Sequence, residues 1–171
     1  MKSLIKKKYS LRETAIEMHE AFMQEAIAIS VESVQTGGGP FGALIVREGE
    51  VLARSSNSVT KDNDPTAHAE INAIRQACQE IGHFELTGCE LYSSCEPCPM
   101  CLSAAYWAGI KKIYFANTRS DAKAIDFDDS FIYDQIPLAA DKRSIPSEQL
   151  LHDKALAAFE LWELMDDKEP Y

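Results

Sequence analysis

The sequence lacks any hydrophobic run long enough to cross a membrane. Its longest apolar stretches, such as residues 41–46, are far below the roughly 18 residues that a membrane-spanning helix needs. Residues 1–8 also lack the apolar segment that a secretion signal contains. We therefore expect no membrane partner and a cytoplasmic protein.

The sequence also lacks internal repeats, low-complexity tracts and linkers rich in Pro, Gly or Ser. Its 171 residues are enough for one well-buried core and few for two. Apolar residues make up 46% of the chain and charged residues 26%, which is ordinary for a globular protein. We expect a single folded domain with at most a terminal extension.

Basic residues are few. Lys and Arg number 17 against 27 Asp and Glu, which gives a formal net charge of −10. Nucleic-acid binding depends mainly on Lys and Arg that neutralise phosphates. The charge therefore argues against a nucleic-acid partner and favours a small, neutral substrate.

The pattern of apolar residues and breakers predicts alternating helices and strands. Gly37-Gly38-Gly39-Pro40 marks the end of the first helix, and a helix placed between the last two strands predicts a parallel crossover. Ile145-Pro146 is at best an edge strand. This order implies a mixed sheet with helices on both faces. Helices are predicted at about 14–34, 65–81, 97–108, 128–135 and 154–165, and strands at 41–47, 51–57, 89–93 and 113–116.

Two short motifs carry metal chemistry: His68-Ala69-Glu70 and Pro97-Cys98-Pro99-Met100-Cys101. The five cysteines are an odd number, and three of them cluster at 95, 98 and 101, a spacing better suited to a metal than to disulfides. A catalytic zinc ion takes three protein ligands and leaves one position to water, whose pKa it lowers toward about 7. We predict one such ion, held by His68, Cys98 and Cys101.

Glu70 is the predicted proton shuttle, because a carboxyl group beside the metal can accept and return protons during hydrolysis. A His-x-Glu motif alone occurs by chance on many helices, and a Cys-x-x-Cys motif alone is more often a redox or structural zinc site. A closed structural site with Cys95 as fourth ligand is the non-enzymatic alternative. The two motifs together match the known signature of zinc deaminases.

Four parts of the sequence strengthen this match. They are Gly39-Pro40-Phe41-Gly42-Ala43, then Asn57, then residues 63–70 and 94–101. With them the chain resembles the cytidine-deaminase-like superfamily. Residues 127–133 and the final Tyr171 resemble the small bacterial guanine deaminases within it. The resemblance covers about residues 19–171, as the zinc deaminase domain, and leaves residues 1–18 as an N-terminal extension.

The resemblance implies an α/β fold, a three-layer α/β/α sandwich with a mixed five-stranded sheet. It also implies the substrate contacts: Asn57 hydrogen-bonds a purine, Phe41 packs on its face, and Asp129 and Tyr171 read its far edge. Asp129 also assists proton transfer. Without the resemblance, Asp129 would be interpreted as part of an acidic surface and Tyr171 as a frayed chain end.

Two other residues are assigned to the substrate pocket. Ala69 lies between the ligand His68 and the shuttle Glu70. Trp107 shares a predicted helix with the cysteines and either lines the pocket or packs in the core.

The activity that the resemblance implies is hydrolysis of guanine to xanthine and ammonia, with zinc as cofactor. It further implies a homodimer in which the C-terminal segment, about 150–171, is exchanged between subunits. Deaminases of guanosine, of an amino-triazine such as ammeline, or of tRNA adenosine share the metal motifs and remain alternatives. The acidic charge opposes the tRNA enzyme.

Overall fold

The computed structural model describes residues 11–170, and their side chains from residue 15 onward. The basic N-terminal segment up to residue 10 and the predicted substrate residue Tyr171 therefore lie outside the described residues. The chain divides into two compact units, one up to Asp128 and one from Asp129 on.

The first unit is built on one mixed sheet with strand order β2-β1-β3-β4. Strands β1 (Gly42–Arg47) and β2 (Glu50–Ser56) form the predicted antiparallel hairpin. Strand β3 (Cys89–Cys95) pairs antiparallel with β1 and parallel with β4 (Lys112–Asn117), which confirms the predicted crossover.

The expectation of five strands is wrong, because the described residues form four. After β4, the side chains of Thr118 and Asp121 form a capping box that starts the short helix α5 (Arg119–Lys123), so the chain turns away from the sheet. The remaining candidate, Ile145-Pro146, forms no strand. Its proline has no N–H to donate to a ladder, and Ile145 is 78% exposed.

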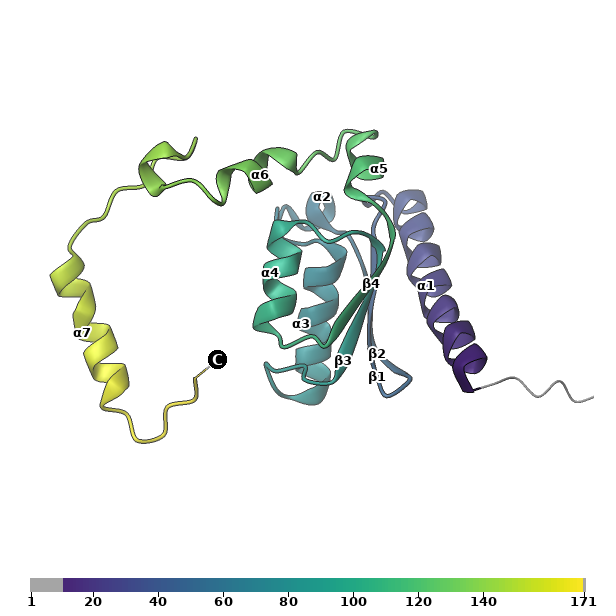
Figure 1. The fold of residues 1–171 in the computed structure, drawn as a ribbon, viewed down its shortest axis with the longest axis horizontal. Helices are drawn as coiled ribbons and strands as arrows, with labels where there is room; N and C mark the ends of the chain where they lie inside the picture. Colours follow the sequence, from purple (N-terminus) through teal and green to yellow (C-terminus); the bar gives the residue numbers. More distant parts are fainter. Residues whose placement is uncertain (1–10, 171) are drawn as a thin grey trace, which may run out of the picture. The chain divides into compact units, whose positions relative to one another are not determined.

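Helices cover both faces of the sheet and make three layers (Figure 1). Helix α1 (Leu11–Gln35) covers one face, and α3 (Ala69–Ile81) and α4 (Pro99–Trp107) cover the other. Strand β1 is buried on both sides: Ala43 and Ile45 join the core under α3, whereas Leu44 joins the core under α1. A strand that is covered on both faces is expected to have a continuous run of apolar residues, and residues 43–46 form such a run.

Two helices begin later than predicted. The carboxylate of Asp64 does not cap a helix that starts at Pro65. It accepts hydrogen bonds from the backbone N–H and hydroxyl of Thr66 at 2.7 Å and closes a turn. The chain then extends to His68, so α3 starts at Ala69. Likewise α4 starts at Pro99, with Cys98 as its N-cap. A short helix α2 (Val59–Asp62), which was not predicted, precedes this turn.

The second unit contains helix α6 (Ser130–Gln135), a 3-10 turn (Ala140–Lys142) and helix α7 (His152–Glu163). Both α-helices agree with the sequence prediction to within two residues at each end. Across the described part of the chain, no helix is long and apolar enough to span a membrane.

Helix α1 lies very close to the sheet at Gly42, the first residue of β1. A Cβ atom at this position would collide with the carbonyl oxygen of Ala26 and lie 2.7 Å from the backbone nitrogen of Ser30, both in α1. Because both obstacles are backbone atoms, no side-chain rotation relieves them. The side-chain-free residue lets α1 lie directly on the strand.

We expect Gly42→Ala to lower the free energy of unfolding by about 3 kcal/mol, the upper range for overpacking a rigid site. Gly88→Ala is the matched control. A Cβ there meets nothing within 4 Å, and only its left-handed backbone (φ +83°) adds a cost of about 1 kcal/mol. Urea unfolding of both variants checks the prediction. Equal losses would show that α1 does not constrain Gly42.

Candidate metal centre

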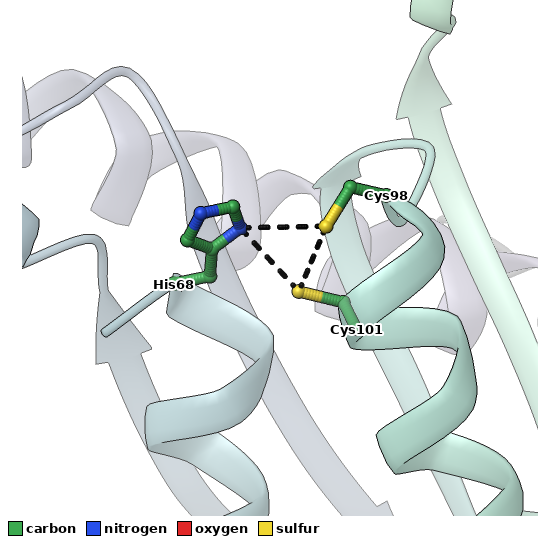
Figure 2. A group of neighbouring side chains, drawn as sticks. All are labelled: His68, Cys98 and Cys101. Atoms are coloured by element: carbon green, nitrogen blue, oxygen red, sulfur yellow. Dashed lines mark hydrogen bonds between the residues drawn. The ribbon is translucent and has the colours of Figure 1, made fainter. Parts of the chain in front are cut away.

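Three predicted ligands from two distant segments meet at one point (Figure 2). The Nδ1 atom of His68 lies 3.6 Å from the sulfur of Cys98 and 3.5 Å from the sulfur of Cys101. The two sulfur atoms are 3.6 Å apart. All three donor atoms face a common centre and form the one His/Cys/Asp/Glu group found in the described part of the chain that could hold a metal ion.

Helix starts position these donors. His68 and Cys98 are the N-cap residues of α3 and α4, and Cys101 lies in the first turn of α4. Neither side chain makes a capping hydrogen bond to its helix, so both remain available to a metal. The positive ends of two helix dipoles meet here, and this favours thiolate over thiol.

The donor set fits zinc in both chemistry and size. One imidazole and two thiolates are characteristic ligands, with bonds of about 2.0 to 2.3 Å. The edge of a tetrahedron with such bonds is about 3.3 to 3.8 Å, and the observed donor separations of 3.5 to 3.6 Å fall within it. The hydrogen bond shared with Cys101, together with the nearby His68, lowers the pKa of Cys98 to about 4. A thiolate is therefore available at neutral pH.

Glu70 lies in the first turn of α3, only 5% exposed. Its Oε2 atom is 3.5 Å from the sulfur of Cys101, and its Oε1 atom accepts a hydrogen bond from the hydroxyl of Ser93 at 3.2 Å. Burial raises the pKa of the Glu70 carboxyl above its ordinary value. A buried carboxyl beside the metal donors is suited to taking up and releasing protons.

Cys95 lies outside this group. Its thiol donates to the carbonyl oxygen of Thr118 at 3.6 Å, and burial raises its pKa to about 11. A closed site with Cys95 as the fourth ligand therefore finds no support in the geometry. Three donors leave one position of a tetrahedral ion for water.

Asn57 lies directly after β2 and is 6% exposed. Its Oδ1 atom accepts a hydrogen bond from the backbone N–H of Val59 at 3.3 Å, which fixes the orientation of the amide. A Cβ atom on Gly39 would lie 3.0 Å from the same oxygen, and one on Gly38 would collide with the hydroxyl of Ser33. The sequence interpretation used both glycines as a helix stop and Gly39 also as part of the family resemblance, but it missed that they pack against Asn57.

The comparisons with known proteins agree with this site. Residues 16–117 match the family model for the cytidine and deoxycytidylate deaminase zinc-binding region. The chain is a member of this family. The matched range includes the whole four-stranded sheet and every residue of the metal centre. Zinc is accordingly its cofactor.

Among this deaminase's relatives, the guanine deaminase of Bacillus subtilis (strain 168) is 47% identical over 154 residues, which cover 90% of this chain and 99% of the relative. The X-ray structure of guanine deaminase from Bacillus subtilis superposes with a TM-score of 0.87 over 90% of this chain and 98% of that one. A tRNA-specific adenosine deaminase from Aquifex aeolicus is 42% identical, but over 57% of this chain and 64% of its own length.

The other predicted pocket residues of this deaminase are dispersed. Ala69 is fully buried beside His68 at the start of α3. Phe41 packs edge to face against Phe127, with ring centroids 5.0 Å apart. Trp107 is 69% exposed at the far end of α4, about 13 Å along the helix from Cys98. Within its own chain, Trp107 is therefore not brought to the metal centre.

Two predicted residues lie beyond the first unit of the deaminase. Asp129 is the N-cap of α6 and begins the second unit. Tyr171 lies outside the described residues. Their substrate contacts stay predictions.

We expect Cys101→Ser to lose most of the bound zinc, because a serine hydroxyl is a far poorer ligand than a thiolate. Cys95→Ser is the matched control and should retain about one zinc per chain. Metal content per chain of the purified proteins is the measurement. Loss of zinc from the Cys95 variant would instead indicate a closed, structural site.

Proposed function

We propose that this protein hydrolyses guanine to xanthine and ammonia. The observation that carries this proposal is the extent of the match to the Bacillus subtilis guanine deaminase, which spans 99% of that relative. The match covers 154 of the 171 residues, so it extends beyond the family model, which ends at residue 117, and includes most of the second unit. The similarity to the tRNA-specific enzyme of Aquifex aeolicus spans only 97 residues.

Charge favours the same choice. The net charge of −10 is unsuited to a tRNA substrate, whose binding requires basic residues facing phosphates. A purine base carries no phosphate, and a buried pocket suits it. The cysteines of the described chain are unpaired, and we place the enzyme in the cytoplasm, where reducing conditions keep thiols free.

His68, Cys98 and Cys101 would hold the zinc ion, which when bound lowers the pKa of a coordinated water toward about 7. Glu70 moves the protons. It takes one from the water that adds to C2 of guanine and delivers it to N3. It then takes the proton of the C2 hydroxyl group and delivers it to the amine, which leaves as ammonia while the C2 oxygen stays on xanthine as a carbonyl. A buried carboxyl with a raised pKa is matched to both transfers near neutral pH.

Asn57 and Phe41 orient the purine in this proposal. The Oδ1 atom of Asn57 already accepts a hydrogen bond from the backbone N–H of Val59. The NH₂ group of the same amide can therefore donate a hydrogen bond to an acceptor atom of the purine ring. The ring of Phe41, which packs edge to face against Phe127, offers an aromatic face on which the purine stacks. Asp129 is proposed to bind the ring N–H groups and to assist the second proton transfer.

We further propose a homodimer in which the C-terminal segment, about 150–171, completes the partner's site with Tyr171. Two features support it. Residues from Asp129 on form a unit of their own, and helix α7 leaves Phe159 and Leu161 at 71% and 67% exposure. Large apolar side chains exposed on a short helix favour a protein contact.

The proposed function predicts ammonia release from guanine by the zinc-loaded protein, and little from guanosine, adenine, cytosine or ammeline. Ammonia release from each compound is the measurement. Turnover of cytosine alone would reject the assignment of a purine substrate. A preference for guanosine or ammeline would show that this compound, and not guanine, is the substrate. Glu70→Gln is the control and should lower kcat by about 10² to 10⁴ while keeping its zinc.

Segment exchange predicts complementation between two inactive variants. One carries Glu70→Gln, and the other ends at Pro170. After the two are unfolded and refolded together with zinc, half the dimers are mixed, and each mixed dimer has one complete site if Tyr171 serves the partner. We expect about a quarter of wild-type turnover of guanine. No recovered activity, with mixed dimers present, would place Tyr171 in its own subunit's site. Activity of the truncated variant by itself would place Tyr171 outside the site.

A further inference from the structure

We propose that Ser93 is a positioning residue for Glu70, an inference that rests on the function proposed above. Ser93 is 1% exposed and lies on the central strand β3, whereas Glu70 lies on helix α3. The Ser93 hydroxyl donates to the Oε1 atom of Glu70 at 3.2 Å, across 23 residues of sequence. This bond links the proposed proton shuttle to the most buried part of the sheet.

Strand geometry directs this hydroxyl to the correct face. Alternate residues of β3 point to opposite sides. Cys89 and Leu91 join the core under α3, so Ser93 follows on that side, whereas Tyr92 joins the core under α1. Ser93 is thus a polar residue at an inward-facing strand position, and such a residue requires a hydrogen-bond partner.

Metal binding makes the Ser93 bond more important. Without metal, the Cys101 thiol also donates to Glu70, from the sulfur to the Oε2 atom at 3.5 Å. A zinc-bound thiolate has no proton to donate. Ser93 then remains as the side-chain donor to Glu70, and by holding Oε1 it leaves Oε2 directed toward the metal side.

The position of a proton-transfer group affects chemistry more than substrate binding. An error of about 1 Å in such a group can cost a factor of about 10² in rate. Among the residues that the structure describes, the Ser93 side chain makes no hydrogen bond to the metal donors. Its loss should therefore lower kcat and leave both KM and zinc content nearly unchanged.

The matched control is the next residue. Ser94 has the same 1% exposure, but its hydroxyl accepts a hydrogen bond from the backbone N–H of Gly42 at 3.0 Å, on the α1 side. Ser94→Ala removes a buried hydrogen bond from the same strand without touching Glu70. The activity of this variant therefore shows the effect of losing a buried hydrogen bond that does not involve Glu70.

We expect Ser93→Ala to lower kcat for guanine about tenfold, with KM within about twofold of wild type and zinc retained. Ser93→Thr, which keeps the hydroxyl, should restore most of kcat, and Ser94→Ala should keep kcat within about twofold. A wild-type kcat in Ser93→Ala, or equal losses in the Ser93→Ala and Ser94→Ala variants, would overturn the proposal.

A second measurement does not depend on activity. Unfolding free energies of Ser93→Ala, Glu70→Ala and the double variant, all zinc-loaded, form a double-mutant cycle. We expect the two losses to be non-additive, because either change breaks the same bond. Additive losses would contradict the contact. If wild-type protein releases no ammonia from guanine, the proposed function fails while this cycle still decides whether Ser93 holds Glu70.

Discussion

The convergence of two helix N-termini on one face of the sheet is the constraint on which the rest of the site depends. Helices α3 and α4 both pack against the face of the sheet opposite α1, and their first residues carry His68, Cys98 and Cys101. Donor separations of 3.5 to 3.6 Å require those starts to be fixed within tenths of an ångström. The parallel β3–β4 crossover fixes α4, and the core around Ala69 and Ala73 fixes α3.

The small residues of this core are part of the same constraint. Ala43, Ala69 and Ala73 are fully buried where α3 meets the sheet, and they let the helix lie close to the strands. Close packing brings the first turn of α3, and Glu70 with it, into reach of β3. Burial then has an electrostatic effect, because an ionised carboxyl loses its hydration and its pKa rises. The packing that stabilises the fold thus also prepares the proposed acid–base group.

The opposite face of the sheet supports the site indirectly. Gly42 lets α1 lie against β1, and the chain leaving α1 passes through Gly38 and Gly39 against Asn57. The Asn57 amide is fixed between this loop and the N–H of Val59. The orientation of a proposed substrate contact therefore depends on glycines that carry no functional group.

The metal donors, the ion they bind and the order of the longer helices and the strands could be predicted from the sequence alone. The residue types at 68, 98 and 101 are intrinsically zinc ligands, and hydrophobic periodicity is a local property. Three features could not be predicted in this way. They are the number of strands, the late starts of α3 and α4, and the bond from Ser93 to Glu70. The bond joins residues 23 positions apart, and local patterns carry no record of which buried polar group meets which partner. The start of α3 and the end of the sheet depend instead on the side-chain hydrogen bonds of Asp64 and of the Thr118–Asp121 capping box, which compete with the helix and strand signals of the same segments.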